Sequence, residues 1–429
     1  MPYTETPSPD RIRQRAGTIS LLMQEEDARA NEASLAELDR LLCTAGAEPV
    51  FRMVQQRAVP NVRTYIGKGK VTELGELCRK NEVNLVVFDA ELSPSQIRNL
   101  ENELGEEIQV IDRSMLILDI FALHATSGEG KLQVELAQLK YTVPRLAGRG
   151  TELSRQGGGA IAARGPGESK LETDKRHIHR RMDALEAELD ALRARRQTQR
   201  KQRDRSGIYR FAIAGYTNAG KSTLLNRLTG AGILAEDKLF ATLDPTARKF
   251  TLPCGEDILL TDTVGFIRNL PHHLIRSFQS TLEEVAYADA ILVLIDASDP
   301  ESEAQLAVTE SLLADLGGGE KQILYLYNKC DREAEFEPIV PASIPKENLF
   351  FLSARTGQGI DALIARMEQL VQADTGRYSF LLPLTEQGTL NKMYSLAQVE
   401  QVEYRETGIA VVAVCDARAK GLFQKWMTE

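Results

Sequence analysis

The order of apolar and polar positions in the first part of the chain switches between two periods. Apolar residues recur with the spacing of a helix in three segments, and short apolar runs lie between them. Helices and strands in this order favour a sheet with helical crossovers. We therefore predict a small α/β domain over residues 1–114. Its predicted helices lie at 33–45, after the loop with Gly67 and Gly69, and at 93–104, and its predicted strands at 48–56, 84–90 and 108–112.

The helical period dominates the next segment. Two long helical stretches, at about 114–140 and 168–203, flank the glycine-rich connection GRGTELSRQGGGAIAARGPGES. In the second stretch, leucines spaced four and three apart fall on one face of a helix. We predict a helical hairpin over 115–205, with one buried seam and a solvated outer face. The seam is predicted to contain Leu185, Leu189 and Leu192.

Apolar runs and helices alternate again over residues 206–375, which predicts a mostly parallel sheet with helices on both faces. The expected strands are YRFAIAG, KFTL, DILLTD, AILVLID, QILYLYN and NLFFLSA. The last segment, 376–429, has strand-like runs on both sides of a helix near 386–397, which predicts a small α+β domain. The whole chain is thus predicted to be a multidomain α/β protein.

The composition is typical of a soluble globular protein, since 43% of the 429 residues are apolar and 26% are charged. The longest strongly apolar run, 290–295, is too short to span a membrane. The N-terminus lacks the apolar core of a secretory signal. The five cysteines form no CxxC pair, and the five histidines have no metal-binding spacing. We expect a cytoplasmic protein without a membrane span, and we expect it to be a monomer.

Charge is unevenly spread along the chain. The net charge is −9, but residues 145–205 hold 16 Lys and Arg against 9 Asp and Glu, so this segment carries +7 and the remainder −16. Such asymmetry points to a polyanionic partner for this one segment. A solvated helix face would explain the same charges, so the sequence leaves both interpretations open.

The stretch GYTNAGKS, residues 215–222, lies between the apolar run YRFAIA and the helical stretch STLLNRL. It matches G-x-x-x-x-G-K-[ST], the phosphate-binding P-loop, in the context of strand and helix that makes the motif specific. Gly215 and Gly220 allow a tight loop whose N–H groups face the phosphates, and the following helix attracts anions. Lys221 is expected to reach the β- and γ-phosphates, and Ser222 to give an oxygen to Mg²⁺.

Two further positions can respond to the terminal phosphate. Asp262 ends the run ILLT, where a carboxylate can hold Mg²⁺ through water and the Gly265 N–H can meet the γ-phosphate. Thr242, in the stretch LFATLDPT, can complete the magnesium shell with its hydroxyl. The predicted magnesium ligands are therefore Ser222, Thr242 and Asp262, and the predicted catalytic groups are Lys221, Thr242 and Gly265.

The base is read by a third group of residues. NKCD, residues 328–331, follows the strand-like run QILYLY, at the end of the strand where nucleotides bind in open α/β sheets. Asp331 can accept from guanine N1–H and N2–H, a donor pair that adenine does not present. Asn328 can bond the opposite edge of the base, and the Lys329 stem can cover it. In the stretch SAR, the Ala354 N–H can donate to guanine O6.

These elements in order indicate a guanine-nucleotide switch, with GTP as ligand and Mg²⁺ as cofactor. An ATP-using P-loop kinase is disfavoured by NKCD and by the lack of an acceptor-substrate motif. The predicted GTP-binding residues are Gly215, Tyr216, Thr217, Asn218, Ala219, Gly220, Lys221, Ser222, Thr223, Phe240, Ala241, Thr242, Leu243, Asp244, Asp262, Thr263, Val264, Gly265, Asn328, Lys329, Cys330, Asp331, Ser353, Ala354 and Arg355.

The chain also resembles the HflX family of bacterial GTPases, from about residue 15 to its end. The stretches that carry the resemblance are GEGKLQVELAQLKYTVPRL (128–146), RGPGESKLETDKR (164–176), LFATLDPTARK (239–249) and LPHHLIRSFQSTLEEVAYADAILVLIDASDP (270–300). The resemblance implies an N-terminal α/β domain, a helical hairpin, a GTPase domain and a small C-terminal domain. It also implies association with the large ribosomal subunit and, in some members, splitting of stalled ribosomes under stress. One departure is Ala162, where the family pattern has a further glycine, and this leaves the conformation of the loop open.

Phe266 follows Gly265, at the position where many nucleotide hydrolases keep a glutamine that orients the attacking water. Its side chain can neither donate nor accept a hydrogen bond. Either it packs into a local core, or a partner supplies the missing group, and the two hypotheses are compatible. Phosphoryl transfer depends on positioning and charge stabilisation, so a donor from a partner raises the rate by orders of magnitude. We expect slow GTP turnover by the isolated protein and faster turnover on the ribosome.

The glycine-rich connection leaves several hypotheses open. Its basic side chains suit rRNA phosphates, and the loop QGGGAIAARGPGE can insert into RNA, close over GTP or only connect two helices. An arginine finger from this connection is a further hypothesis, although nothing in the sequence places an arginine near the γ-phosphate. A second class of function is an RNA-binding module within 1–205 whose attachment the GTPase domain regulates. The predicted RNA-contact residues are Arg149, Arg155, Arg164, Arg180 and Arg181.

Overall fold

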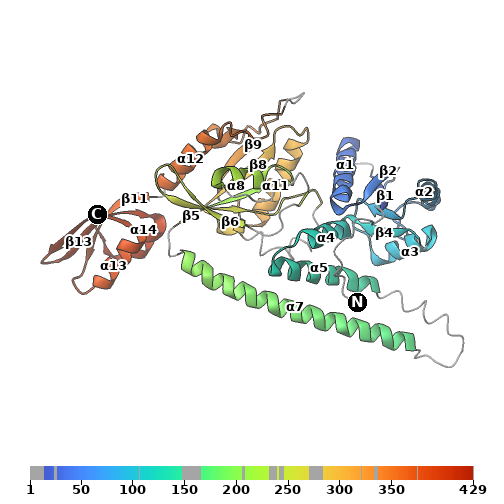
Figure 1. Ribbon diagram of the computed structural model, residues 1–429, viewed down its shortest axis with the longest axis horizontal. Coiled ribbons are helices and arrows are strands. Elements are labelled where there is room, and N and C mark those ends of the chain that lie inside the picture. The colour runs from blue at the N-terminus through green and yellow to red at the C-terminus, as the bar shows by residue number, and fades with distance from the viewer. Residues whose placement is uncertain are drawn as a thin grey trace. The chain divides into compact units, whose positions relative to one another are not determined.

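The structure is a computed structural model, and it describes residues 14–23, 27–105, 107–146, 166–204, 208–230, 239–240, 246–269, 284–319, 321–332, 337–373 and 375–428. Figure 1 shows the helices and strands of these ranges. They form two compact units, one made mainly of the chain up to Leu189 and the other mainly of the chain after it. No helix in the described ranges is long and apolar enough to cross a bilayer.

The first unit begins with a parallel four-stranded sheet in the order β2-β1-β3-β4. Helix α1 packs against α4 and α2 packs against α3, so that each face of the sheet is covered by two helices. The predicted α/β arrangement is confirmed. Its elements are β1 (Arg15–Leu22), α1 (Ala28–Ala45), β2 (Glu48–Gln56), α2 (Lys68–Lys80), β3 (Leu85–Phe88), α3 (Pro94–Leu104), β4 (Gln109–Asp112) and α4 (Arg113–His124).

The hydrophobic pattern predicts no strand at 15–22, yet β1 lies in the middle of this sheet. The sequence RAGTISLL lacks a period of two because both faces of the strand are covered, and its interior positions are all buried. Small and hydroxyl-bearing residues suit this place. A Cβ at Gly17 would meet the ring of Phe51, and Thr18 donates to Asp39 at 3.2 Å. A strand covered on both faces escapes a search for alternation.

The helical stretch predicted at about 114–140 is two helices, α4 and α5 (Gly128–Leu146). Helix α4 ends because Ala125 takes an extended conformation. Ser127 then starts α5 by accepting a hydrogen bond from the Gly130 N–H at 2.9 Å. The prediction of one continuous helix is therefore wrong, because the capping serine breaks a stretch whose apolar spacing looks continuous.

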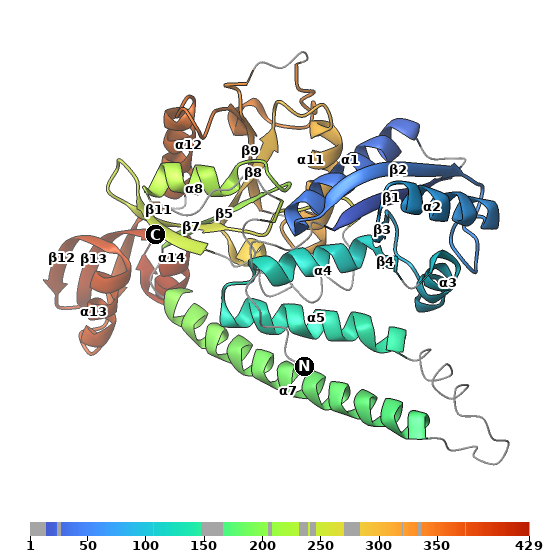
Figure 2. The same ribbon diagram turned by 45° about the vertical axis from the view of Figure 1, so that its right-hand side comes forward.

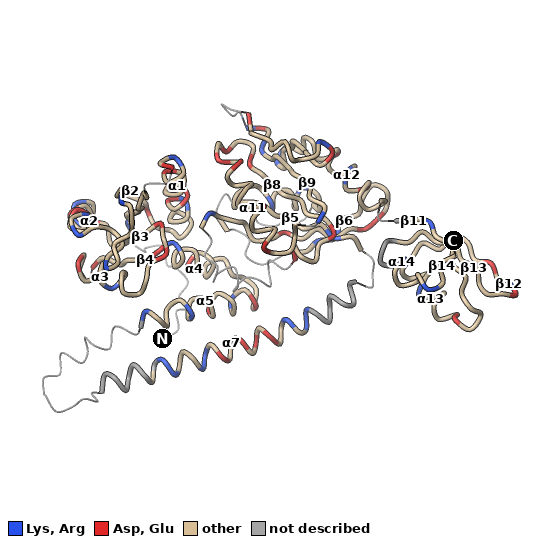
Figure 3. Tube along the Cα trace, turned by 180° about the vertical axis from the view of Figure 1, so that it is seen from behind, with Lys and Arg blue, Asp and Glu red and all other residues tan. Residues whose placement is uncertain are grey.

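Helices α5 and α7 (Pro166–Asp204) form the predicted hairpin. Figure 2 shows α5 between α4 and α7. Of the three leucines predicted for the seam, Leu192 is only half-buried. Arg181 of α7 pairs with Glu135 of α5 at 2.7 Å on the flank of the seam. Lys and Arg are interspersed with Asp and Glu along the described part of α7 (Figure 3). The buried seam contains Leu136, Leu185 and Leu189.

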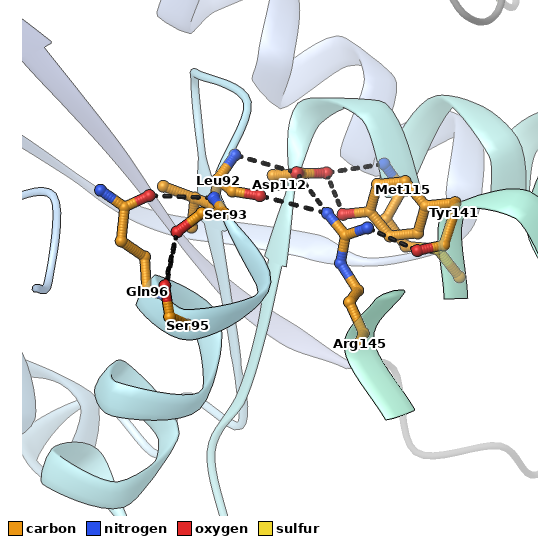
Figure 4. A network of polar contacts seen from close by, with 8 residues as sticks. All are labelled: Leu92, Ser93, Ser95, Gln96, Asp112, Met115, Tyr141 and Arg145. Atoms are coloured by element: carbon orange, nitrogen blue, oxygen red, sulfur yellow. Dashed lines mark hydrogen bonds and ion pairs between the residues drawn. The ribbon is translucent and has the colours of Figure 1, made fainter. Parts of the chain in front are cut away.

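A buried carboxylate ties the last turns of α5 to the first sheet (Figure 4). Asp112, the last residue of β4, is 0% exposed. The Tyr141 hydroxyl donates to its Oδ1 at 2.5 Å, and an Arg145 Nη2 lies 3.3 Å from its Oδ2. The N–H groups of Leu92 and Met115 donate to the same carboxylate, at 3.1 and 2.9 Å. The charge is thus matched by a cation and by donors from three elements of the first unit.

The second unit contains a six-stranded sheet in the order β10-β9-β8-β5-β7-β6. All neighbouring strands are parallel except β6 and β7, which confirms the predicted mostly parallel sheet. Helices α8 (Lys221–Thr229) and α12 (Ile360–Ala373) share one hydrophobic cluster with the strands of this sheet, and α11 (Ser302–Asp315) contacts β8 and β5. Its elements are β5 (Tyr209–Gly215), α8 (Lys221–Thr229), β6 (Thr246–Thr251), β7 (Asp257–Asp262), β8 (Ala290–Asp296), α11 (Ser302–Asp315), β9 (Gln322–Asn328), η1 (Lys346–Asn348), β10 (Leu349–Phe351) and α12 (Ile360–Ala373).

The end of the chain forms an antiparallel sheet in the order β12-β13-β11-β14, with helices packed on one face. Phe380, Met393 and Val411 lie in its core. This agrees with the predicted α+β segment. Its elements are β11 (Thr375–Leu382), α13 (Gln387–Leu396), β12 (Gln398–Arg405), β13 (Gly408–Asp416), α14 (Ala417–Phe423), η2 (Gln424–Trp426) and β14 (Met427–Thr428).

Candidate nucleotide site

Polar residues lie at the carboxyl ends of four neighbouring strands of the six-stranded sheet. Gly215 ends β5, Asp262 ends β7, Asp296 ends β8 and Asn328 ends β9. Strand β5 lies between β7 and β8, where the strand order changes direction. Ligands of open α/β sheets bind in the crevice at such a switch point. The sheet therefore brings three of the predicted motifs to one edge and adds Asp296 to them.

The P-loop has the backbone conformation that its glycines were predicted to permit. Gly215 has φ 145° and Gly220 has φ 100°, both in the region that favours glycine. A Cβ at Gly215 would meet the Leu294 carbonyl, and one at Gly220 would meet the Asn328 amide nitrogen. Asn218 also has a positive φ, of 62°. The loop between β5 and α8 thus turns sharply while it packs closely on neighbouring strands.

Lys221 lies under this loop and is 7% exposed. Its Nζ donates to the carbonyl oxygens of Gly215, at 3.2 Å, and Tyr216, at 2.8 Å. Burial lowers the pKa of Lys221 to about 8, against the attraction of Asp262, and repulsion by Lys329 lowers this pKa further. Neutral carbonyl dipoles thus hold a cation whose charge an anionic ligand would match much better.

Two hydroxyls lie close to this lysine in the chain. The Ser222 Oγ donates to Asp262 Oδ2 at 2.8 Å, and Asp262 is fully buried. Thr217 Oγ1 is buried, and it has no hydrogen-bond partner among the described residues. Buried polar atoms are usually paired, and this unpaired hydroxyl lies in the loop that is predicted to bind phosphates.

Asn328 bridges two loops of the site. Its Nδ2 donates to the Ala219 carbonyl of the P-loop at 2.8 Å, and its Oδ1 accepts from the Ala354 N–H at 2.9 Å. The sequence predicts that Asn328 and Ala354 both contact the base, but it contains no sign of this link between them. Their predicted contacts with guanine stay predictions. The link shows how the base-reading loop and the phosphate-binding loop are held in register.

Asp331, the predicted guanine reader, is exposed at the surface. The Ser353 hydroxyl donates to its Oδ1 at 2.6 Å, and this hydrogen bond lowers the pKa of Asp331. The carboxylate is therefore kept ionised and oriented, which suits an acceptor for the two N–H groups of guanine. Ser353 thus connects the two predicted base motifs.

Asp296 is a member of the site that the sequence analysis did not assign. Its Oδ2 lies 2.7 Å from Lys329 Nζ, and both side chains are largely buried. The Ser298 N–H and hydroxyl both donate to its Oδ1, at 3.0 and 2.6 Å. Lys329 itself has φ 65°. An acidic residue at the end of the run AILVLID was a signal for this role, of the same kind that identified Asp262.

Phe266 is 1% exposed, so its side chain packs into a core as one of the two hypotheses states. Phe240, predicted to border the nucleotide, is also buried, and its ring lies edge-to-face on Phe121, with centroids 4.7 Å apart. Thr263 donates from its hydroxyl to the Ile213 carbonyl at 2.8 Å.

Several predicted residues lie outside the described part of the chain. These include the predicted magnesium ligand Thr242 and most of its neighbours. Among the predicted RNA contacts, Arg180 is exposed on α7, whereas Arg181 pairs with Glu135 at 2.7 Å within the hairpin. The predicted residues outside the described ranges are Arg149, Arg155, Arg164, Ala241, Thr242, Leu243 and Asp244.

Three family models match the chain in succession. Residues 32–122 match the model described as GTP-binding GTPase N-terminal, residues 124–203 match GTP-binding GTPase Middle Region, and residues 210–329 match 50S ribosome-binding GTPase. Together they extend over most of the chain. The third model contains the P-loop, Asp262 and Asn328.

Relatives named GTPase HflX align with nearly the full chain. The protein of Caldanaerobacter subterraneus subsp. tengcongensis is 46% identical over 403 residues, which cover 94% of this chain and 91% of that protein. The protein of Lacrimispora saccharolytica is 48% identical over 389 residues, covering 91% and 90%. The protein of Escherichia coli strain K12 is 39% identical over 375 residues, covering 87% of each.

Among solved structures, a GTP-binding protein from the archaeon Sulfolobus solfataricus in complex with GDP covers 83% of this chain and 99% of its own. Its sequence is 25% identical, and its TM-score is 0.42. A TM-score below 0.5 is too low to place individual residues, so the assignment of the family rests on the sequence matches.

Proposed function

The chain belongs to the HflX family of GTPases, and from this premise we propose that it is a GTP-driven switch that binds the large ribosomal subunit. Members of the family hydrolyse GTP to GDP and phosphate, and the site at the edge of the six-stranded sheet has the parts for this reaction. What the proposal adds is the partner, the metal and the source of the missing catalytic group.

One observation carries the proposal, namely that polar groups predicted to bind the nucleotide lie together at one edge of the sheet while Phe266 is buried. Lys221, Ser222 and Asp262 converge at the end of β5 and β7, while Phe266 offers no polar atom to a water molecule. Such a protein binds GTP but hydrolyses it slowly until another molecule supplies the missing donor. The family model over residues 210–329 is described as ribosome-binding, which supports the ribosome as that molecule.

The oxygen pair of Ser222 and Asp262 fits a magnesium ion, since Mg²⁺ prefers hard oxygen ligands and binds few protein groups directly. Their hydrogen bond of 2.8 Å holds the two oxygens close enough to share one ion, Asp262 acting through water. We propose Thr242 as the third protein ligand. When bound, Mg²⁺ neutralises charge on the β- and γ-phosphates.

In the hydrolysis step, a water oxygen forms a bond to the γ-phosphorus while the bond to the β–γ bridging oxygen breaks, giving GDP and phosphate. Lys221 exchanges its carbonyl partners for β- and γ-phosphate oxygens, and the P-loop N–H groups hold the same phosphates. We propose that the Gly265 N–H contacts the γ-phosphate. Phe266, the residue after Gly265, has no polar side-chain atom that could orient the water. The orienting group therefore has to come from another molecule.

Steady-state GTP hydrolysis by the purified chain, alone and with purified subunits, tests the proposal. We expect a rate on the order of 10⁻³ s⁻¹ alone, as for switch GTPases that lack their activating partner. Large subunits should raise it by about a hundredfold or more, and small subunits should leave it unchanged. Many turnovers per second without ribosomes would contradict the proposal. Sedimentation of the free chain in the same buffers checks that it is a monomer.

The same proteins distinguish splitting of stalled ribosomes from a role in subunit assembly. Light scattering of intact ribosomes falls when the chain with a non-hydrolysable GTP analogue separates the subunits. If scattering stays constant while the chain cosediments with free large subunits, an assembly role is favoured. Either result keeps the large subunit as partner.

The base-reading assignment has its own test in Asp331→Asn. An amide in place of the carboxylate presents a donor to guanine N1–H, and we expect GTP affinity to fall by about a hundredfold while xanthosine triphosphate becomes the preferred ligand. Fluorescence titration of labelled nucleotides measures both affinities. Unchanged affinity for GTP would show that another residue reads the base.

A further inference from the structure

A loop of the first unit combines a run of cations with exposed apolar side chains. Residues 57–67, RAVPNVRTYIG, connect β2 to α2. Over the wider range 49–72 the chain has five Lys and Arg and no Asp or Glu, although its net charge is −9. This cationic run lies in the α/β domain, far along the chain from the basic segment 145–205 that the sequence analysis identified.

Hydrogen bonds within the loop fix its shape. Asn61 and Tyr65 exchange backbone N–H···O bonds, both of 2.8 Å. The Asn61 side chain accepts from the N–H groups of Arg63, at 2.8 Å, and Thr64, at 3.3 Å. Ile66 is fully buried in the core beneath the loop. The backbone polar groups of the turn are thus largely satisfied by the loop itself.

Helix α3 braces the loop from outside. The Gln96 side-chain amide donates to the Asn61 carbonyl at 3.1 Å, and the Asn99 amide donates to the Arg63 carbonyl at 2.9 Å. At the end of the loop, the Gly67 N–H donates to the Gln55 side chain at 2.8 Å. A loop braced in this way keeps its conformation without a partner, so the side chains that it exposes have a defined position.

The exposed side chains are apolar where a solvated turn usually has polar ones. Val62 is 91% exposed and Val59 is 65% exposed, and Pro60 between them is exposed as well. Turns favour Gly, Asn, Asp, Ser and Pro, and a β-branched residue gains nothing in such a place. A single exposed valine is ordinary on any protein. Two of them on a rigid loop among cations suit contact with a partner.

Two of the five cations in the range 49–72 have no ion-pair partner among the described residues, while Arg52 pairs with Asp39 at 2.6 Å and Lys70 with Glu73 at 2.8 Å. No carboxylate in the described part of the chain lies within ion-pair distance of Arg57 or Lys68, whereas Arg63 pairs with Glu103 at 3.2 Å. The Arg57 guanidinium lies over Gly67, since a Cβ there would meet its Nη1 at 2.8 Å. The first turn of α2 contains Lys68 and no acid, and the helix dipole adds to this positive charge. Arg57 and Lys68, at the two ends of the loop, are therefore the cations left for a partner in the described part of this range.

We propose that residues 57–68 form an RNA-contact surface, in which Arg57 and Lys68 bind phosphates and Val62 packs on a ribose or a base. Charge complementarity selects a polyanion, and RNA offers both phosphates and flat apolar faces. The inference rests on the proposed function, because it assigns this 57–68 surface to rRNA of the large subunit. It gives the α/β domain a binding role of its own.

Two variants of the full chain test the surface. Lys68→Ala removes one phosphate contact, and Val62→Ser removes only the apolar contact. Lys80→Ala, at the exposed other end of α2, is the matched control.

Each protein, loaded with a non-hydrolysable GTP analogue, is titrated with large subunits at several salt concentrations. Both variants should bind about threefold to tenfold more weakly than wild type. Lys68→Ala should also reduce the slope of log affinity against log salt by about 0.7 to 1, and Val62→Ser should leave the slope unchanged.

The same titration with protein-free large-subunit rRNA separates this inference from the proposed function. If wild type does not bind subunits, the proposed function fails, but the 57–68 surface still predicts that Lys68→Ala weakens binding to the free rRNA and Lys80→Ala does not. Equal affinities of all four proteins for subunits and for rRNA would overturn the inference alone. Weaker binding of Lys68→Ala with an unchanged salt slope would also overturn it, because the contact would then not be a phosphate. Unchanged GDP affinity and thermal unfolding of both variants confirm that they are folded.

Discussion

Both units bury charged side chains, but the two buried sites are completed in different ways. Asp112 in the first unit is 0% exposed, and its carboxylate is matched by Arg145, Tyr141 and two backbone N–H groups. Lys221 in the second unit is 7% exposed, and its Nζ donates to neutral carbonyl oxygens. A buried charge matched by its own chain is part of the fold, whereas one held by dipoles is kept for a ligand.

The hydroxyls of the two sites show the same difference. The Tyr141 hydroxyl donates to a buried carboxylate at 2.5 Å, and burial beside Asp112 raises the pKa of Tyr141 far above its ordinary value. Thr217 Oγ1, in the P-loop, is buried without a partner among the described residues. Arg145 Nε of the first site also has no hydrogen-bond partner among the described residues, so the difference between the sites lies in how the buried charge and the hydroxyl are matched.

The largest effect that this comparison predicts is on the stability of the first unit. Asp112→Ala leaves the Arg145 guanidinium partly buried without its partner, and we expect a loss of about 3–5 kcal/mol in the free energy of unfolding. Nucleotide affinity should stay within about twofold of wild type. Circular dichroism during urea unfolding measures the loss. Tryptophan fluorescence would not report on the first unit, because the chain's one tryptophan, Trp426, lies in the C-terminal sheet region. Asp183→Ala, on the exposed face of α7, is the control.

Lys221→Ala should show the opposite pattern. GTP and GDP affinity should fall by at least about a hundredfold, roughly 2.8 kcal/mol, because the phosphates lose their buried cation. The free energy of unfolding should stay equal or rise slightly, since the variant no longer buries a cation without a matching anion. Calorimetric titration and urea unfolding measure the two quantities, with the exposed Lys346→Ala as control. A loss of stability as large as that of Asp112→Ala would break the comparison.

Sequence alone predicts the parts of the site that are local in the chain. The P-loop, Asp262 and the 328–331 motif each occupy a few consecutive residues at the end of an apolar run, and parallel strands end at one edge of a sheet. Their convergence in the structure follows from these two facts. The mostly parallel sheet could be predicted for the same reason, from the alternation of apolar runs and helices.

What the sequence could not show depends on contacts between distant segments. The hydrogen bonds from Asn328 to Ala219 and Ala354 join three loops, and no residue spacing in the sequence predicts them. Strand β1 was missed because burial on both faces removes alternation. The rigidity of the 57–68 surface depends on amides from α3, so that its exposed valines looked like ordinary loop residues. Tertiary packing decides all of these features.

Asp296 occupies an intermediate position in the comparison, because it pairs with a cation but does so inside the nucleotide site. We expect that it positions the Lys329 stem against the base, so Asp296→Asn should weaken guanine nucleotide binding by about tenfold, or 1.4 kcal/mol. The turnover rate at saturating GTP should not change. The double variant with Lys329→Met should bind no more weakly than Lys329→Met alone. Additive losses would show that Asp296 acts independently of Lys329, as a purely structural residue.

The smallest effect comes from the titration of Lys221, whose pKa burial lowers from 10.5 to about 8. Between these values the unfolded chain binds more protons than the folded chain, so the contribution of Lys221 to stability rises with pH through this window. The affinity for GTP changes in the opposite direction and falls as the pH rises, because the phosphates bind the protonated amine of Lys221. From pH 7 to pH 8.5, GTP affinity should therefore fall by about fourfold.

Calorimetry in two buffers of different ionisation enthalpy should show proton uptake on binding near pH 8. Lys221→Arg, which stays charged, should bind GTP equally at both pH values. A fourfold fall that persists in Lys221→Arg would assign the titration to another group and remove the electrostatic contrast between the two sites.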